Sequence, residues 1–372
     1  MKVVLDSSIL CADFRLEGGP FETFFQGLTR IGARCYLPET VLDEVIAGQR
    51  RQLDEIEQKV ERLQGKWMQL AGCPLPLVPA ATSQTRPDYA GYLRAQLKER
   101  EVEILPYPDV PHKTLVARAL ARCRPFKESG GGYRDALIWH STLALIEGDA
   151  DHVCLVTANT KDFGIAPALH PDLQKDVRSG VVVELFNTLE QFNAAKVVPV
   201  LERLGDLMHR LEEGTFSPFS LDRWIDENII KAINENEDVR HFVPLEYGHG
   251  RVWASELMGI ESTVIDDVRL LPSGDILLMA NADIRIEVVV SAGWEDCERH
   301  RDVREFFGGD CSGDSSIRAE EEGNVAFTLT LKKDTFQATW CDIDALETSS
   351  GSVEINPHER REVEAGEASQ QT

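Results

Sequence analysis

The sequence predicts an α/β fold for about its first 200 residues, a doubly wound parallel sheet with helices on both faces, joined to a smaller β-rich C-terminal domain. Up to about residue 200, short apolar runs alternate with longer helical patterns, which is typical of a parallel sheet. Beyond about residue 250, apolar residues alternate with polar ones, which is typical of an antiparallel sheet with one buried face. The 372 residues suffice for two or three domains.

Four segments of the first half are predicted to be buried parallel strands, because their apolar residues are continuous. They cover residues 2–5, 33–37, 153–157 and 181–185. Between the second and third of them, Thr40 opens a long helical stretch, and a further helix is expected over residues 89–100. Pro74, Pro76 and Pro79 break the chain between these helices, so a loop is expected there.

The long helical stretch carries an apolar stripe. Its members recur at alternating steps of three and four residues: Leu53, Ile56, Val60, Leu63, Trp67 and Leu70. One explanation is that the stripe packs on its own domain or on a returning helix. The other is a coiled coil with a second copy, which makes a homo-oligomer through residues 53–70 a candidate assembly.

The second half begins with a charged helical stretch over about 201–237. Strands are expected at 262–271, 276–282, 284–291, 325–331 and 335–340, with a hairpin connection at 332–334. Val325, Phe327, Leu329 and Leu331 alternate with small or polar residues and should form a buried face. We therefore expect a first domain at 1–200, a helical linker at 201–250, a β-rich acidic domain at 251–348, and a disordered tail at 349–372.

Charge is distributed unevenly between the halves. Residues 1–200 hold 23 Lys and Arg against 26 Asp and Glu, whereas residues 201–372 hold 16 against 37. The two halves are therefore expected to have different partners. There is no apolar run long enough to span a membrane, and Asp6 interrupts the first apolar run too early for a signal peptide. The eight cysteines form no CxxC pair, so we expect reduced thiols in a cytoplasmic protein without a membrane partner.

Four acids stand where predicted strands end or helices begin. Asp6 follows the first strand, Glu44 lies on the next helix, Asp135 opens a later helix, and Asp162 follows the third strand. Ligands of an open α/β sheet bind at the carboxyl ends of its strands, so these acids should share one edge. Converging carboxylates repel one another unless a divalent cation lies among them, and hard oxygen ligands suit Mg²⁺ or Mn²⁺.

Each acid also has a simpler explanation. Asp6 could cap a turn or a helix, and Asp162 could lie on a surface loop. Glu39 and Asp43 compete with Glu44, because a solvated helix face accommodates any of the three. Asp135 is the strongest candidate, since a carboxylate followed at once by three apolar residues would otherwise be costly so near a core.

The order of these acids and the stretches RDALIW (134–139) and VTANTKDF (156–163) resemble the PIN-domain nucleases over about residues 1–195. The resemblance implies a PIN-like fold in which Asp6, Glu44, Asp135 and Asp162 are the catalytic, metal-binding acids. It also implies supporting roles for Ser8 and Asn159. Many members read T-x-D-x-D-F, whereas Asn159-Thr160 replaces the first of those acids here. The number of bound metal ions, one or two, therefore stays open.

A basic stretch leads directly to Asp135. Between His112 and Arg134 there are six Lys or Arg residues against the single acid Glu128. Arg118 and Arg122 are four residues apart and are expected to share a helix face. A nucleic-acid backbone that approaches an acidic site needs such positive charge. We predict that the RNA-binding residues are Lys113, Arg118, Arg122, Lys127 and Arg134; a solvated basic helix is the alternative.

Together these features predict a Mg²⁺- or Mn²⁺-dependent endoribonuclease. The resemblance implies RNA that is single-stranded or structured, with tRNA among the candidates, and a toxin or defence role in bacteria. The sequence lacks Walker A, GxSxG and GxGxxG motifs, and the Cys297–His300 CxxH with Cys311 lacks the second pair of a zinc site. The alternative function is a catalytically weak PIN-like module that binds RNA or proteins.

Overall fold

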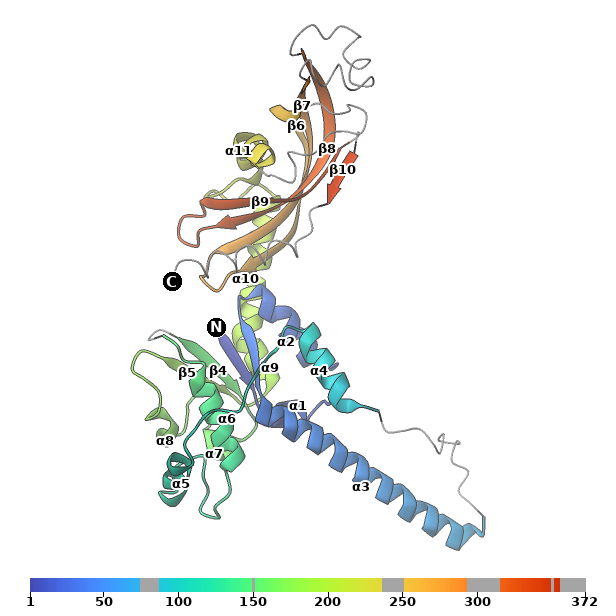
Figure 1. Ribbon diagram of the computed structural model, residues 1–372, viewed down its shortest axis with the longest axis vertical. Helices are drawn as coiled ribbons and strands as arrows, with labels where there is room; N and C mark the ends of the chain where they lie inside the picture. The colour runs from blue at the N-terminus through green and yellow to red at the C-terminus, as the bar shows by residue number, and fades with distance from the viewer. Residues whose placement is uncertain (74–86, 149–150, 236–250, 293–314, 349–350, 355–372) are drawn as a thin grey trace. The chain divides into compact units, whose positions relative to one another are not determined.

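The computed structural model describes residues 1–73, 87–148, 151–235, 251–292, 315–348 and 351–354. The chain divides into two compact units, Met1–Leu201 and Glu202–Thr372, shown in Figure 1. We call them the N-terminal unit and the C-terminal unit. The loop expected at Pro74, Pro76 and Pro79 lies outside the described residues, and so do Cys297, His300 and Cys311.

The N-terminal unit is built on a parallel sheet with strand order β3-β2-β1-β4-β5. Its strands are β1 (Lys2–Leu5), β2 (Arg34–Pro38), β3 (Glu103–Leu105), β4 (His152–Val156) and β5 (Val182–Phe186). The predicted α/β class is therefore confirmed, and four of the five strands lie where continuous apolar runs predicted them. β3 was not predicted, because a three-residue strand that begins with Glu103 gives no apolar run.

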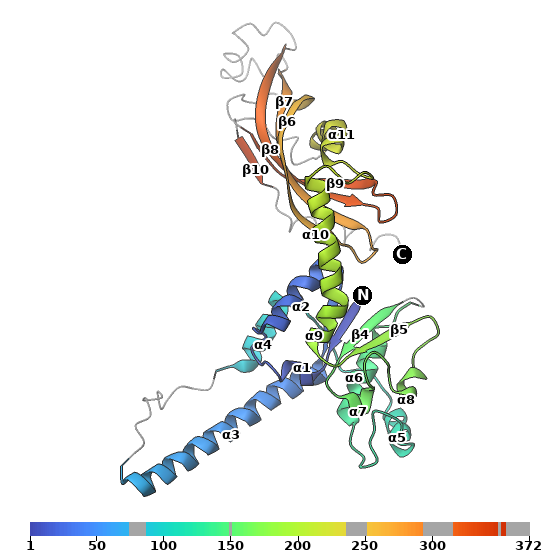
Figure 2. The same ribbon diagram turned by 180° about the vertical axis from the view of Figure 1, so that it is seen from behind.

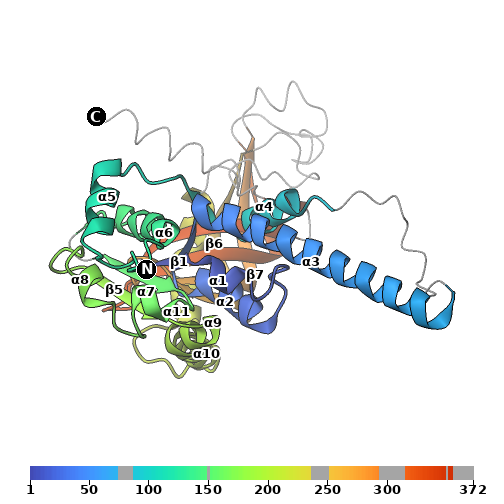
Figure 3. The ribbon, with the colours of Figure 1, turned by 90° about the horizontal axis from the view of Figure 1, so that it is seen from below.

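Helices cover both faces of this sheet (Figures 2 and 3). The helices of the unit are α1 (Ser7–Leu10), α2 (Gly19–Arg30), α3 (Glu39–Ala71), α4 (Tyr89–Glu99), α5 (His112–Leu120), α6 (Tyr133–Ala144), α7 (Thr160–Phe163), α8 (Pro171–Gln174), α9 (Leu189–Phe192) and the π-helical turn η1 (Asn193–Val197). Phe24 of α2 packs edge-on against Phe192 of α9, and both are fully buried. Figure 3 shows α5 and α6 across the sheet from α2 and α9. The doubly wound arrangement brings the ends of β1 and β4 to one edge, because these strands are parallel neighbours.

Helix α3 is longer than its packing requires. Its buried residues are Thr40, Val41, Leu42 and Val45, all in the first two turns. Every residue from Glu55 to Ala71 is exposed, and Figure 3 shows this part extending away from the rest of the N-terminal unit. From Ile56 onward, the apolar stripe is therefore exposed, whereas Leu53 is half-buried.

The C-terminal unit is an antiparallel meander with strand order β10-β9-β8-β7-β6. Its elements are α11 (Leu221–Glu235), β6 (Arg251–Leu270), β7 (Ile276–Ala292), β8 (Ser315–Leu331), β9 (Ala338–Thr348) and β10 (Gly351–Glu354), and α10 (Val198–Glu212) leads into the unit. The predicted alternation is confirmed, since Val325, Phe327, Leu329 and Leu331 are all buried. Trp224 of α11 stacks on Phe327 and helps to cover this face.

Three expectations for the second half are wrong. The strands predicted at 276–282 and 284–291 are one strand, β7, because Asp283 faces solvent in an unbroken ladder instead of ending it. Residues 335–337 belong to the turn before β9. Residues 351–354 of the predicted disordered tail form β10, which pairs with β9; residues 349–350 and 355–372 lie outside the described residues. Among the described helices, none combines the length and apolarity that crossing a membrane requires.

Candidate active site

Asp6 follows β1 directly and is held from three sides. Its carboxylate accepts hydrogen bonds from the Ser7 backbone N–H (2.8 Å), the Ser8 hydroxyl (2.6 Å) and the Thr157 hydroxyl (2.7 Å). Its exposed fraction is only 3%. Thr157 follows β4, so this contact joins the ends of two neighbouring parallel strands. A buried carboxylate with three donors is fixed in position, as a ligand or a catalytic group requires.

Asp135 and Asp162 are joined through one amide. Asn159 donates from its Nδ2 to Asp135 Oδ1 (3.1 Å) and to Asp162 Oδ2 (2.9 Å). Asp135 lies in the first turn of α6, where the helix dipole favours negative charge. Asp162 lies in α7, just after β4, and is fully buried. The structure therefore brings Asp6, Asp135 and Asp162 to the carboxyl end of the sheet; we call these three the acid cluster.

The pKa of Asp135 is affected by the other two acids of the cluster. Burial, followed by the negative charges of Asp162 and Asp6, raises the pKa of Asp135 to about 6. Lys127 and the Asn159 hydrogen bond act in the opposite direction without cancelling the shift. The rise therefore reflects burial first and the nearby negative charges of Asp162 and Asp6 second.

A glycine positions Asp135 against the preceding loop. Gly132 precedes the first residue of α6 with φ of 113°, a conformation that favours glycine. A Cβ atom at Gly132 would lie 2.3 Å from the carbonyl oxygen of Pro125. The close approach places the loop that carries Arg124 and Lys127 beside the N-terminus of α6.

Basic side chains of that loop reach the acid cluster itself. Arg124 Nη1 lies 3.0 Å from Asp162 Oδ1, and Lys127 Nζ lies 2.6 Å from Asp162 Oδ2. Because Asp162 is fully buried, these pairs offset the cost of its charge. Lys127 also lowers the pKa of Asp135, but this pKa remains raised.

Glu44 lies beside the acid cluster on α3. Its side chain is 15% exposed and pairs with Arg134 Nη1 at 2.6 Å. Asp6 and Glu44 both contribute to the raised pKa of Cys11, after its burial, so Glu44 faces the same neighbourhood as Asp6. Its rival Asp43 is exposed and accepts a hydrogen bond from the Tyr107 hydroxyl.

The remaining basic candidates divide into two kinds. Arg118 does not face solvent: its side chain is 13% exposed, and it pairs with Asp176 at 2.8 Å. The expected common helix face for Arg118 and Arg122 is wrong, because α5 ends at Leu120 and Arg122 has a positive φ of 52°. Lys113 and Arg122 are exposed.

Sequence reasoning missed Thr157 and Arg124. Thr157 could have been found, because it is a hydroxyl residue directly after β4, in the position that Asp6 has after β1. Arg124 belongs to the basic stretch, but local sequence does not show that it pairs with Asp162, 38 residues later. Such a contact depends on where the loop before α6 turns.

The acid cluster fits a hard divalent cation in its chemistry and only in part in its geometry. Carboxylate and amide oxygens are the donors that Mg²⁺ and Mn²⁺ prefer, and burial together with Asp162 and Asp6 raises the pKa of Asp135. Among the described residues, however, the group of three ligand side chains whose atoms all lie within 4.8 Å of one another is at the other end of β4. Side-chain rotation is therefore needed before three of the acids could share one ion.

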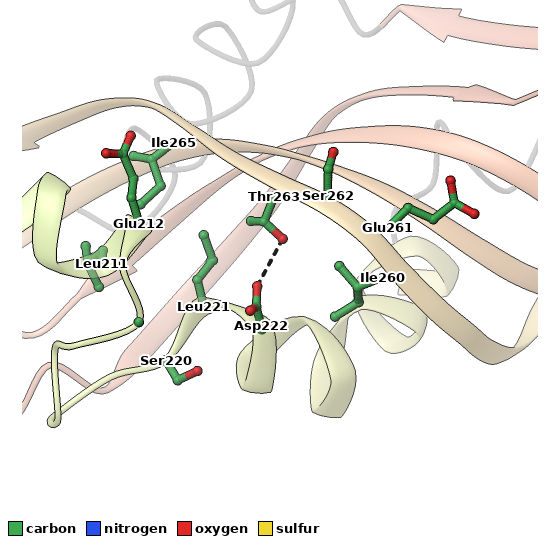
Figure 4. Close-up of a pocket in the computed structure, with 11 residues that line it drawn as sticks. Leu211, Glu212, Ser220, Leu221, Asp222, Ile260, Glu261, Ser262, Thr263 and Ile265 are labelled. Atoms are coloured by element: carbon green, nitrogen blue, oxygen red, sulfur yellow. Dashed lines mark hydrogen bonds between the residues drawn. The ribbon is translucent and has the colours of Figure 1, made fainter.

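The C-terminal unit has a separate pocket of about 280 Å³ between the α10–α11 turn and β6 (Figure 4). The Asp222 carboxylate accepts a hydrogen bond from the Thr263 hydroxyl across it (3.0 Å). Glu212, Asp222 and Glu261 line it, and its described lining includes no Lys, Arg or His. A pocket of this charge does not suit a polyanion.

Comparison with known proteins agrees with the geometry. Residues 3–163 match the model of the PIN-domain family, and this range contains all four candidate acids. No curated protein and no solved structure gave a significant match. PIN domains are generally nucleases that use divalent metals, and the predicted resemblance is confirmed for this part of the chain. Residues 3–163 of the N-terminal unit are therefore similar to PIN domains.

Proposed function

We propose that this protein is a Mg²⁺- or Mn²⁺-dependent endoribonuclease whose active site is the acid cluster with Glu44. The observation that supports this most directly is Asp135, a carboxyl group with a pKa near 6 between two further buried acids. When Asp135 ionises without a cation nearby, its charge lowers the stability of the folded protein. A cation that binds between the acids best explains why they are placed together.

The site contains residues that would bind the ion and residues that orient them. Asp6, Asp135, Asp162 and Glu44 would hold the ion, which when bound polarises the scissile phosphate and makes an attacking water more acidic. Ser8 and Thr157 fix the orientation of Asp6 through their hydroxyls. Asn159 fixes Asp135 relative to Asp162 through its amide. Hydrogen bonds of this kind orient metal-binding carboxylates.

The positive charges near the acid cluster suggest the substrate. Arg124 and Lys127 lie at Asp162, and Lys113 and Arg122 are exposed on the same segment. These cations would offset the repulsion between RNA phosphates and the acids. We propose single-stranded or structured RNA, with tRNA among the candidates, and a cytoplasmic toxin or defence role.

The test is cleavage of a mixed RNA pool by the full-length protein with Mg²⁺, with Mn²⁺ and with chelator, beside a DNA pool of matched length. We expect RNA fragments with either ion and intact RNA in chelator. RNA that stays intact under all conditions would contradict a nuclease. Cleavage of DNA alone would contradict the proposed substrate.

A catalytically weak module that binds RNA or proteins is the second candidate. It is favoured by the ion pairs of Arg124 and Lys127 with Asp162, because a bound cation would compete with both. RNA binding without cleavage, unchanged when Asp135 is replaced by Asn, would support this function over the first.

We propose further that the exposed apolar stripe of α3 joins two copies of the chain. Leu63 and Leu70 are 61% and 78% exposed, and the stripe has the spacing of a two-helix coiled coil. The mass in solution tests this: a dimer is expected for wild type, and a monomer for a Leu63→Glu, Leu70→Glu variant. A monomeric wild type would contradict it.

A further inference from the structure

A second group of ligand-type side chains lies on the same sheet, away from the acid cluster. His152 and Cys154 come from β4, and Glu184 comes from β5, where it is the register partner of Cys154. His152 opens β4, whereas Thr157 and Asp162 follow its end. At about 3.3 Å per residue, His152 and Thr157 are roughly 16 Å apart along the strand, so the two groups cannot share an ion.

The distances within this group match those of a tetrahedral transition-metal site. His152 Nε2 lies 3.7 Å from Cys154 Sγ and 3.2 Å from Glu184 Oε1, and one ligand atom from each residue falls within 4.8 Å of the others. With Zn–S near 2.3 Å and Zn–N or Zn–O near 2.0–2.1 Å, tetrahedral geometry separates S and N by about 3.6 Å and N and O by about 3.3 Å. The sheet therefore already holds these atoms at about the required spacing.

The donor set selects the kind of ion. Imidazole nitrogen and thiolate sulfur suit Zn²⁺ and its chemical relatives, whereas Mg²⁺ and Mn²⁺ prefer oxygen ligands alone. A fourth position is available to water or to the Met1 thioether, whose Sδ lies 3.6 Å from Cys154 Sγ. Since His152 and Glu184 side chains are 33% and 27% exposed, an ion can reach the group from solvent.

Lys196 also contacts Glu184, and this contact fits two explanations of the group, an ion-pair network or a metal site. Lys196 Nζ lies 2.7 Å from Glu184 Oε2, while Glu184 Oε1 faces His152. In a purely structural ion-pair network, Lys196 and His152 simply share this carboxylate. In a metal site, Lys196 holds Oε2 and leaves Oε1 as a single ligand oxygen, as outer hydrogen bonds commonly do.

We propose that His152, Cys154 and Glu184 bind one zinc-type divalent cation, distinct from the ion of the acid cluster. Binding releases the Cys154 thiol proton to solvent and joins β4 to the edge strand β5. Its effect is to stabilise the N-terminal unit, because only the folded sheet brings these residues together.

Cobalt titration of the full-length protein tests this, because a thiolate ligand to Co²⁺ adds a charge-transfer band in the near ultraviolet. We expect this band to saturate at one equivalent in wild type and to be lost on adding Zn²⁺ but not on adding excess Mg²⁺. Cys154→Ala should abolish it. Cys35→Ala is the matched control, since Cys35 is also buried, in β2 of the same sheet, and β1 separates it from β4; its titration should equal that of wild type.

Two further measurements keep the result interpretable if Cys154→Ala folds poorly. His152→Gln should also lose the band, while His209→Gln, on an exposed helix position, should retain it. Zn²⁺ should raise the melting temperature of wild type and of Asp135→Asn, and should not raise that of His152→Gln. A missing band in wild type, or a band that persists in Cys154→Ala and His152→Gln, would overturn the proposal.

Discussion

Asp135 in the acid cluster of the N-terminal unit and two acids of the C-terminal unit, Asp275 and Asp283, show opposite pKa shifts. In the N-terminal unit, which is nearly neutral, three acids converge and the pKa of Asp135 rises to about 6. In the strongly acidic C-terminal unit, hydrogen bonds from Lys332 and the Lys333 N–H lower the pKa of Asp275, and those from Asn324 and Ser262 lower the pKa of Asp283. The count of acids therefore does not locate a site. Several carboxylates that converge at one edge of a sheet are the better guide, because the pKa of Asp344 in the C-terminal unit is raised by its own burial.

Topology explains the difference. Parallel strands end at a common edge, so acids placed after β1 and β4 meet at that edge. In the antiparallel meander, Asp283 lies beside a cross-strand donor, since Asn324 Nδ2 donates to Asp283 Oδ1 from the neighbouring strand at 2.7 Å. Asp275 and Asp283 are thus stabilised as isolated anions, whereas the acid cluster is prepared for a cation.

The largest expected effect is on cleavage when the acid cluster loses a charge. Asp6→Asn keeps the shape of the side chain and an acceptor for Ser8 and Thr157, but it removes the negative charge. We expect RNA cleavage to fall by about 100-fold or more, as when one preorganised electrostatic group is removed. Asp88→Asn is the matched control, because Asp88 caps α4 outside the site and Asn caps equally well. Equal rates for the two variants would contradict the assignment.

A smaller loss of cleavage is expected when Thr157, which sequence reasoning missed, loses its hydroxyl. Thr157→Val removes the hydroxyl that donates to Asp6 and keeps the side-chain volume. We expect a loss of about 10- to 100-fold in cleavage or metal affinity, typical for residues that orient a metal ligand. The control is Thr142→Val, a buried threonine of α6 whose hydroxyl bonds only the Ile138 carbonyl. A wild-type cleavage rate for Thr157→Val would show that the Thr157 hydroxyl is not needed to orient Asp6.

Next is the salt dependence of RNA binding. Replacing Lys113 and Arg122 by Gln should flatten the slope of log K against log salt by about 0.7 per lost contact to a single strand. Arg94→Gln with Lys98→Gln, on the exposed face of α4, is the control pair and should leave the slope unchanged. An unchanged slope in the first variant would leave Lys113 and Arg122 as a solvated basic surface.

The smallest effect is expected in the C-terminal unit. Asp222→Asn and Asp283→Asn remove carboxylates that have local donors, so cleavage and Mn²⁺ affinity should change by no more than about 0.5 kcal/mol. Cleavage assays and Mn²⁺ titration of both variants check this. A large loss of Mn²⁺ binding in either variant would contradict the placement of the metal site in the N-terminal unit.

The fold was predictable to the extent that it follows from local patterns. β1, β2, β4 and β5 are apolar runs; Asp6 follows β1 directly and Asp162 lies in the short helix after β4, so strand topology places both at one edge. The roles of Arg118 and Arg124 were not predictable, because they depend on contacts with Asp176 and Asp162, far along the chain.

The group formed by His152, Cys154 and Glu184 was hidden for a related reason. Glu184 lies 30 residues after Cys154, and the two meet only through the register of β4 with β5. The sequence shows neither that register nor which face of the sheet they share.

The central claim is that Asp135 holds a metal ion, and the pH dependence of Mn²⁺ binding tests it most directly. The folded-state pKa of Asp135 is raised from 3.8 to about 6, so without metal the stability of the protein falls as pH rises through this range. Below about pH 6 a proton competes with the ion at Asp135. Calorimetric titration should therefore show wild-type affinity for Mn²⁺ increasing from pH 5 to pH 7, with proton release, and Asp135→Asn should bind weakly at both. Equal affinity in wild type at the two pH values, or wild-type affinity in Asp135→Asn, would contradict the account.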